Sequence, residues 1–323
     1  MIAPLISIII VHWGQQSYLS SCLTSLESQT YKDFEVFIVD NQGGSPIRTD
    51  KWHFPIRVLS PGENIGYTAA NNLAVSLANG HWVVLLNNDA YPAPTWLGNL
   101  LKAANENPNY TFFASRLLRN EKPERLDGAG DIYHISGLAW RQFYNMPADQ
   151  FGLQSEEVFG PCAAAAMYKR DIFLQVGGFD EDYFAYHEDV DLSFRLRLNG
   201  YKCLYVHDAV VYHVGSGSIG VRSDFAVYYG HRNMVWTLVK NMPAPLLIKY
   251  MPVHLLYTLI MWVYYTSRGQ GCIFIRAKLD AIKSLRQMWQ KRKAIQAESI
   301  VEVNDINQYI SKNLLAPILL RKV

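Results

Sequence analysis

The sequence predicts an α/β protein whose mostly parallel, doubly wound sheet is flanked by helices. Over the first 90 residues, short runs rich in β-branched residues alternate with segments of helical periodicity. The strand-like runs are continuously apolar, which is typical of parallel strands buried on both faces. Half of the 323 residues are apolar and 18% are charged, so a large core can form and a disordered chain is excluded.

The predicted elements follow one another in a regular order. Strands are expected at 5–11, 34–40, 56–60 and 81–89, and helices at 17–29 and 66–78. Leu19, Leu23 and Leu26 share one face of the first helix. Because ligands of such sheets bind at the carboxyl ends of the strands, Asp40 and Asp89 lie where a binding site is expected.

The rest of the chain divides by composition. Helices and strands are mixed from about 93 to 213, and a helix is expected to begin near Asp189. Residues 251–267 contain no Asp, Glu, Lys or Arg, and a basic helix is predicted over 273–297. Eight Lys and Arg residues lie between 268 and 293, opposed only by Asp280, so the basic charge is confined to the C-terminal quarter.

Composition disfavours several classes of protein. The four cysteines form no Cys-x-x-Cys pair, which gives neither a zinc signature nor a disulfide framework and fits a reducing compartment. The apolar start of the chain lacks a basic n-region and a small-residue cleavage site, so we expect a buried strand rather than a signal peptide. The net charge of +2 gives no reason to expect a nucleic-acid partner.

Two polar stretches adjoin predicted strands and helices. In "IVDNQGG", Asp40 can accept hydrogen bonds from a nucleobase or ribose, or it can form an ordinary Asp-Asn turn. In "ENIGYTAANN", Asn64 and Gly66 precede a helix whose first N–H groups suit a phosphate or a sugar hydroxyl. The alternative there is a helix cap formed by Asn64.

Two further residues have the chemistry of metal ligands. Asp89 ends "LLNND" and could anchor Mg²⁺ or Mn²⁺ whose other ligands come from a diphosphate and water, or it could cap a turn. His213 follows an alternating strand and precedes a Gly/Ser loop, so it is either structural or a ligand that favours Mn²⁺. Trp13, Trp82 and Trp140 could stack on a sugar or base, although core packing is the simpler expectation for each.

The densest group of polar residues is "FDEDYFAYHEDVDL", at 179–192. Glu188, Asp189 and Asp191 would stand at the start of a helix, where carboxylates cap free N–H groups and favour the positive end of the helix dipole. The surrounding aromatic residues could instead desolvate a carboxylate and raise its pKa, as a general base requires. The local pattern leaves both interpretations open.

Taken in order, these stretches resemble the family 2 glycosyltransferases, in particular their bacterial rhamnosyltransferase-like branch. The resemblance covers residues 5–220, about two thirds of the chain, through "SIIIVHWGQQSYLSSCLTSLESQTYKDFEVFIVDN", "ENIGYTAANN", "LLNNDA" and "GGFDEDYFAYHEDVDL". There are two departures. Asn87-Asn88-Asp89 stands where the family has a D-x-D-like motif, so one carboxylate is absent, and "QGGSP" replaces the usual Ser-x-Asp-Gly after "VDN".

The resemblance implies a GT-A fold, a Rossmann-like sheet flanked by helices, in residues 1–222. A nucleotide-binding part would span about 1–92 and an acceptor-binding part about 93–222, with a helical region at 223–323. The nucleotide-sugar site would then comprise Asp40, Asn64, Gly66, Asn88 and Asp89. Asp189 would be the catalytic base, Asp89 and His213 the ligands of Mn²⁺ or Mg²⁺, and Glu188 and Asp191 supporting residues.

The implied activity is inverting transfer of a sugar, with rhamnose the first expectation, from a nucleotide-diphosphate donor to a glycan or lipid-linked glycan of a bacterial surface polysaccharide. A sugar-nucleotide nucleotidyltransferase is an alternative, but it would need an Arg- and Lys-containing phosphate loop where this chain has "HWGQQSYLSS". A non-catalytic carbohydrate-binding protein of the same fold is another. The retention of Asp89, Asp189 and His213 argues against it.

The C-terminal region predicts an association with membranes. On the predicted basic helix, one stripe is formed by Leu279, Ile282, Leu285 and Met288 or Trp289. This is the pattern of an interfacial helix attracted to anionic lipid. Packing on the catalytic part and a true span are the alternatives, although the apolar run 251–267 is shorter than the roughly 20 residues of a span. We expect a cytoplasmic protein at the inner face of the cell membrane, and a homo-oligomer is compatible with the sequence.

Overall fold

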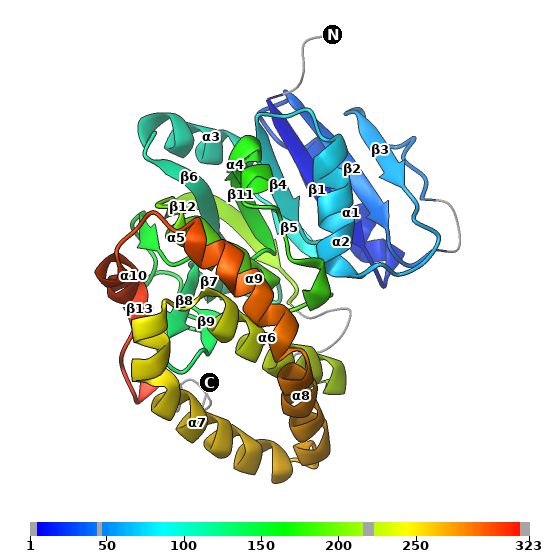
Figure 1. The fold of residues 1–323 in the computed structure, drawn as a ribbon. Helices are drawn as coiled ribbons and strands as arrows, with labels where there is room; N and C mark the ends of the chain where they lie inside the picture. The colour runs from blue at the N-terminus through cyan, green and yellow to red at the C-terminus, as the bar shows by residue number, and fades with distance from the viewer. Residues whose placement is uncertain (1–4, 44–46, 216–222, 317–323) are drawn as a thin grey trace.

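The computed structural model describes residues 5–43, 47–215 and 223–316, and its main feature is one mixed sheet of ten strands (Figure 1). The strands before the C-terminal helices are β1 Ile6–His12, β2 Phe34–Asp40, β3 Ile56–Leu59, β4 Trp82–Leu86, β5 Ala90–Pro92, β6 Tyr110–Arg119, β7 Lys122–Gly128, β8 Asp131–His134, β9 Ala139–Arg141, β10 Glu156–Val158, β11 Ala165–Lys169 and β12 Lys202–His213. Their order in the main sheet is β10-β12-β6-β11-β4-β1-β2-β3, with β5 beside β12 and β7 beside β6. The predicted α/β class is confirmed.

The first half of the sheet is parallel throughout, because β4, β1, β2 and β3 all run in the same direction. Side chains of β1 alternate between two cores. Ile8 and Ile10 enter one core, and Ile9 and Val11 enter the other. The covering helices are α1 (Gln16–Glu27) and α3 (Trp96–Glu106) on the first face and α2 (Gly66–Leu77) on the second. Burial on both faces explains why these strands are continuously apolar.

The second half of the sheet changes direction at β11, which pairs antiparallel with β4 on one side and with β6 on the other. β12 lies parallel to β6, and its last residues pair with the short strand β5. In that pairing His213 stands opposite Ala90, the residue after Asp89. The sheet therefore brings the end of β12 to the turn after β4, two places that are far apart in the sequence.

The C-terminal helices share a core with the sheet-bearing part. The remaining elements are α4 Arg170–Gln175, a 3₁₀ turn Glu181–Tyr183, α5 Glu188–Leu198, α6 Asp224–Asn241, α7 Ala244–Thr266, α8 Gly271–Lys283, α9 Leu285–Ala297, α10 Val303–Tyr309 and β13 Ile310–Ser311. β13 adds a parallel strand to the β8–β9 hairpin. Phe194 of α5, Leu246 of α7 and Ile310 of β13 belong to one buried cluster. In Figure 1, α7 and α8 form the end of the molecule away from β1–β3.

Two predicted elements differ from the structure. The strand expected at 81–89 ends at Leu86, because the carbonyl of Asn87 accepts the N–H of Ala90 and closes a turn. The single helix expected over 273–297 is wrong. Helix α8 ends and α9 begins at Ser284, whose φ of −91° and ψ of 4° break the helical geometry. The turn "NQGGSP" and the Gly/Ser loop after His213 extend into residues 44–46 and 216–222, which lie outside the described residues.

A buried ionic cluster joins α5 to the C-terminal helices. The carboxylate of Asp191 lies 2.7 Å from Nζ of Lys240 and 2.9 Å from Nε of Arg195. The same ammonium lies 2.6 Å from Asp180, in the loop before α5. Burial alone would raise the pKa of Asp191, but the charges of Lys240 and Arg195 hold it far below its usual range. Asp191 therefore makes structural ion pairs and does not cap the helix, which is compatible with the supporting role predicted for it.

Removing this carboxylate should destabilise the fold. Asp191→Ala leaves two buried cations with one counter-charge fewer, so the free energy of unfolding should fall by about 3–5 kcal/mol. Urea unfolding followed by tryptophan fluorescence measures the loss. Lys102→Ala is the matched control, because its pair with Glu106 is exposed and 4.0 Å apart. A loss for Asp191→Ala no larger than that of the control would contradict this account of the cluster.

Candidate functional site

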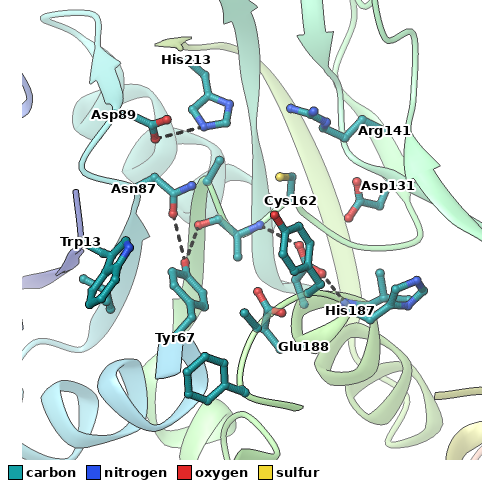
Figure 2. Close-up of a pocket in the computed structure, with 18 of the residues that line it drawn as sticks. Trp13, Tyr67, Asn87, Asp89, Asp131, Arg141, Cys162, His187, Glu188 and His213 are labelled. Carbon is teal, nitrogen blue, oxygen red and sulfur yellow. Dashed lines mark hydrogen bonds and ion pairs between the residues drawn. The ribbon is translucent and has the colours of Figure 1, made fainter. Parts of the chain in front are cut away.

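The carboxyl ends of β1 and β4 open into a cavity of about 650 Å³, which is also lined by the start of α2, the loop before α5 and the β8–β9 hairpin (Figure 2). Four carboxylates line it: Asp89, Asp131, Glu188 and Asp189. Arg141 is the one Lys or Arg side chain among its described lining residues. A cation that entered with a diphosphate would offset the repulsion between the phosphates and the carboxylates that are ionised.

On one wall, Asp89 and His213 lie side by side because β5 pairs with the end of β12. Nε2 of His213 lies 3.3 Å from Oδ1 of Asp89 (Figure 2). On the other side of the ring, Nδ1 lies 2.7 Å from Oδ2 of Asp127, whose carboxylate is also paired with Arg141. Burial would lower the pKa of His213, but the two neighbouring carboxylates raise it to about 9.

The chemistry of this pair fits a divalent metal ion. A carboxylate on Nδ1 is the usual partner of a ligand histidine, since it fixes the tautomer and leaves Nε2 for the metal. Nε2 of His213 is buried and makes no hydrogen bond to the described residues, although Asp89 is close. Across the described ranges, no three His, Cys, Asp or Glu side chains are grouped so that they could hold a metal. A diphosphate and water would have to supply the remaining ligands.

Asp189 lines another wall of the same cavity, in the first turn of α5. Its Oδ2 accepts a hydrogen bond from the N–H of Ala163 (3.1 Å), and its Oδ1 accepts one from the N–H of Val190 (2.8 Å). Burial raises the pKa of Asp189, and the two backbone hydrogen bonds oppose that rise. The carboxylate is held in one orientation with a raised pKa, and both properties suit a general base.

Glu188 directs its side chain into the cavity (Figure 2). Its Oε2 is buried and has no hydrogen-bond partner in the described chain. Burial and the charge of Asp189 raise the pKa of Glu188 well above its usual range, and the same two causes act on Asp131. Glu188 does not act as a helix cap through this oxygen, and the residue lines the cavity.

The N–H groups at the start of α2 are already engaged, which fits the alternative that Asn64 caps this helix, and a nucleotide-sugar contact by Asn64 or Gly66 stays a prediction. The N–H groups of Ile65 and Gly66 donate to the side chains of Asn41 and Asn64, and the next two N–H groups donate to the carbonyl of Phe184. Gly66 has φ +83°, and a Cβ there would lie 2.6 Å from the ring of Phe184. This glycine therefore permits the close approach of the loop before α5. Asn64 still lines the cavity through its side chain.

The loop 183–187 has an unusual backbone. Three of its residues, including His187, have φ between 65° and 67°, a region that residues other than glycine rarely adopt. The side-chain amide of Asn233, buried on α6, donates to three carbonyls of this loop at 2.8, 2.9 and 3.0 Å. Helix α6 therefore stabilises the strained segment that leads into Asp189.

Asp40 lies near the site but does not line the cavity. Its carboxylate accepts hydrogen bonds from the N–H groups of Gln42 and Gly43, which closes the turn after β2. The neighbouring Asn41 lines the cavity instead. This geometry is the Asp-Asn turn that was one of the two expectations for the stretch, and a nucleotide contact by Asp40 stays a prediction.

Asn88 is buried and supports the cavity wall, because its amide donates to the carbonyl of Trp13 at 3.1 Å. The indole of Trp13 is 38% exposed and lines the cavity, as does that of Trp140. Trp82 is buried edge-on against Phe113. The expectation of core packing is confirmed for Trp82 and wrong for the other two tryptophans.

Sequence reasoning missed Asp127, Asp131 and Arg141, which come from β7, β8 and β9. Asp127 orients His213, and Arg141 neutralises Asp127. The only sequence signal for the two acids is "LDGAGDIYH", in which they flank a Gly-Ala-Gly turn. The structure places Asp131 on the cavity wall and Asp127 against His213.

The chain that forms this cavity matches known protein families. Residues 7–177, more than half of the chain, match the family model described as "Glycosyl transferase family 2". The chain belongs to glycosyltransferase family 2. A second model, "Glycosyl transferase family group 2", matches residues 141–277 of this glycosyltransferase.

Relatives and solved structures agree with this assignment. N-acetylglucosaminyl-diphospho-decaprenol L-rhamnosyltransferase of Mycobacterium tuberculosis (strain H37Rv) is 29% identical over 240 residues, 66% of this chain and 77% of that protein. Uncharacterized protein y4gI of Sinorhizobium fredii is 30% identical over 232 residues, 67% of this chain but 25% of its own length, so this chain spans about a quarter of that relative. The crystal structure of GalNAc-T7 with UDP, GalNAc and Mn²⁺ superimposes with a TM-score of 0.63 at 15% identity, covering 95% of this chain and 58% of that one. The GT-A fold is confirmed.

Glu188→Gln should stabilise the substrate-free protein at pH 8. The pKa of Glu188 is higher in the folded than in the unfolded chain. At high pH its ionisation therefore lowers the stability of the folded protein. This cost disappears as the pH falls, because the carboxylate becomes protonated in both states. Gln keeps the shape and removes the charge, so we expect a gain of about 1–3 kcal/mol at pH 8 that shrinks by pH 5. Thermal unfolding at both pH values measures it. Glu106→Gln, on the surface of α3, is the control and should change the stability at neither pH. If Glu188→Gln destabilised the protein at pH 8, the raised pKa of Glu188 would be refuted.

Asn233→Asp should loosen the loop 183–187, because the variant keeps the side-chain shape and removes the donors. We expect a loss of about 1–3 kcal/mol in unfolding free energy. Amide hydrogen exchange in the loop should become faster, and glycosyl transfer should fall with it. Asn105→Asp, exposed on α3, is the matched control. Unchanged exchange in 183–187 would show that the amide is not what holds the loop.

Proposed function

We propose that this family member is a metal-dependent, inverting glycosyltransferase that moves a sugar from a nucleotide-diphosphate donor to a hydroxyl of a glycan. One observation carries the proposal: a single cavity is lined both by the Asp89–His213 pair and by Asp189. Direct displacement at an anomeric carbon needs two groups at once, a centre of positive charge at the leaving diphosphate and a base at the attacking hydroxyl. We assign the first role to a metal ion that Asp89 and His213 would hold, and the second to Asp189.

In the proposed reaction Asp189 accepts the proton of the acceptor hydroxyl while its oxygen attacks the anomeric carbon. The bond from that carbon to the diphosphate oxygen breaks, and the electron pair leaves with the diphosphate. Attack from the side opposite the leaving group inverts the configuration. The N–H groups of Ala163 and Val190 fix the carboxylate during this transfer, and the raised pKa of Asp189 favours proton acceptance.

Asp89 and His213 would hold Mn²⁺ or Mg²⁺, whose charge supports the departure of the diphosphate. Asp127 keeps the imidazole in place through Nδ1. The absence of a second carboxylate at Asn87 and Asn88 leaves more of the coordination sphere to the donor. We therefore expect the metal and the nucleotide sugar to bind together, each weakly without the other.

For the donor we propose deoxythymidine-diphosphate rhamnose first and UDP-hexoses next. For the acceptor we propose a lipid-linked glycan in bacterial surface polysaccharide synthesis, at the cytoplasmic face of the membrane. The relative from M. tuberculosis, an N-acetylglucosaminyl-diphospho-decaprenol L-rhamnosyltransferase by name, supports both choices. The four free cysteines support a reducing compartment.

Asp189→Asn should reduce transfer by about 10²–10⁴-fold, because the amide keeps the shape and cannot accept the proton. Binding of the nucleotide sugar with Mn²⁺ should stay close to that of the wild type. Single-turnover transfer and calorimetric binding measure the two effects. Asp171→Asn, on an exposed side chain of α4, is the matched control. Near-normal turnover of Asp189→Asn would refute the assignment of the base.

Asp89→Ala should abolish metal-dependent binding of the nucleotide sugar. The test is a binding screen of nucleotide sugars with Mn²⁺, with Mg²⁺ and with EDTA, which also identifies the donor. We expect EDTA to remove both binding and transfer, and Mn²⁺ to restore them in the wild type alone. Transfer that persists in EDTA would contradict the metal role, and a product that retains the anomeric configuration would contradict inversion.

A further inference from the structure

The C-terminal helices expose a long apolar surface. One side of α7, here called the outer face, consists of exposed residues at helical spacing: Pro245, Ile248, Lys249, Pro252, Leu255, Leu256, Leu259, Trp262, Val263 and Thr266. Ile248 is 77% exposed, and Leu255 and Val263 are each 60% exposed. Lys249 is the only charged residue of this face. A continuous apolar face of this length marks a surface that binds something.

Helix α8 contacts α7, and it adds further exposed apolar side chains and positive charge. Ile275, Leu279 and Ile282 are 39%, 52% and 58% exposed. Six basic residues between 244 and 297 are exposed, namely Lys249, Arg268, Arg276, Lys283, Arg286 and Lys293. The one acid in this range, Asp280, is already engaged by neighbouring basic side chains. The surface is therefore apolar with a basic surround.

Helix α7 is long and apolar enough to cross a membrane by length and composition, but its contacts argue against a span. Its inner face is buried through Leu246, Leu247, Tyr250, His254, Tyr257 and Met261. Nδ1 of His254 lies 2.7 Å from the carbonyl of Ser136, and Tyr250 donates to Asn307 of α10. A spanning helix would have to leave these contacts and open the core. The helix can instead lie flat with its outer face in a bilayer.

We propose that the outer face of α7 and the exposed side of α8 dock this glycosyltransferase on an anionic lipid bilayer. The inference rests on the proposed function in one respect, the lipid-linked acceptor. Both parts of the surface fit this occupant, since the apolar side chains enter the acyl boundary and the basic ones meet anionic headgroups. A second copy of the chain fits less well, because a twofold contact would bring the two basic surrounds together.

The docking surface lies close to the cavity. The ring of Trp140, which lines the cavity, packs against His134 at a centroid distance of 5.7 Å. His134 in turn packs against Tyr257 on the inner face of α7 at 5.6 Å. Two aromatic contacts therefore connect the cavity wall to the docked helix. A glycan on a membrane lipid would reach the cavity beside the β8–β9 hairpin while its lipid stays in the bilayer.

The experiment is sedimentation of the full chain with vesicles. The wild type should bind vesicles of phosphatidylcholine with phosphatidylglycerol and bind pure phosphatidylcholine weakly. Leu255→Glu/Leu259→Glu places two carboxylates in the outer face and should lower binding about tenfold or more. Leu174→Glu, 41% exposed on α4, is the matched control and should bind as the wild type does. Brominated lipid should quench the fluorescence of Trp262 when the protein is docked. The part of the quenching that is missing in Trp262→Phe belongs to Trp262, so this measurement reports docking without a destabilising substitution.

A second variant, Lys249→Gln/Arg268→Gln/Arg286→Gln, tests the contribution of charge. It should bind anionic vesicles more weakly than the wild type, and added salt should weaken binding of the wild type in the same way. Several outcomes would overturn the proposal: unchanged binding of the Leu255→Glu/Leu259→Glu variant, equal binding to neutral vesicles at all salt concentrations, or resistance to alkaline carbonate extraction, which indicates a span. The proposal would also be overturned if the wild type formed a dimer in solution and did not bind vesicles, and if Leu255→Glu/Leu259→Glu abolished that dimer.

Failure of the docking surface and failure of the enzymatic proposal are separable. Transfer to a water-soluble acceptor analogue, without lipid, tests the enzyme, and the Leu255→Glu/Leu259→Glu variant should retain it. Transfer to an acceptor embedded in anionic vesicles should fall in that variant by about the factor by which binding falls. Equal losses on the soluble and the embedded acceptor would overturn the docking role, because they would indicate damage to the active site.

Discussion

A buried lysine determines how the two parts of the chain fit together. Lys240 is 1% exposed, and its ammonium requires a counter-charge at that position. Asp180 in the loop before α5 and Asp191 within α5 provide it. The same helix α6 carries Asn233, so these ion pairs also set where its amide meets the strained loop. The geometry of Asp189 thus depends on a helix that follows the sheet.

The sheet and its helices could be predicted because their signals are local. Continuous apolar runs mark strands buried on both faces, and residues such as Leu19 and Leu23 mark a helical face. The site could be predicted only in part. Asp89 and His213 have no local signal for each other, since they meet through the pairing of β5 with β12. Asp127 was missed because an acid at the end of a strand resembles any turn residue until its partner is known.

The local patterns that are ambiguous or misleading share one cause, a partner that comes from a distant element. The N–H groups at the start of α2 look available for a phosphate until the carbonyl of Phe184 occupies them. Asp191 looks like a cap until Lys240 reaches it from α6. The periodic pattern of 273–297 continues through Ser284, yet the chain bends there and Met288 enters a cluster with Trp236. Local patterns do not encode such competition.

The core shared by the sheet-bearing part and the C-terminal helices limits how the chain can be divided. A chain cut after residue 222 would expose Tyr133, Phe159 and Phe194, which pack against α6 and α7 in the whole protein. It would also lose Asn233 and with it the support of the loop before α5. If relatives exchanged the part of the chain after residue 222 by recombination, the surface of α7 and the helix that supports the loop before α5 would be exchanged together. Neither property can be inherited without the other.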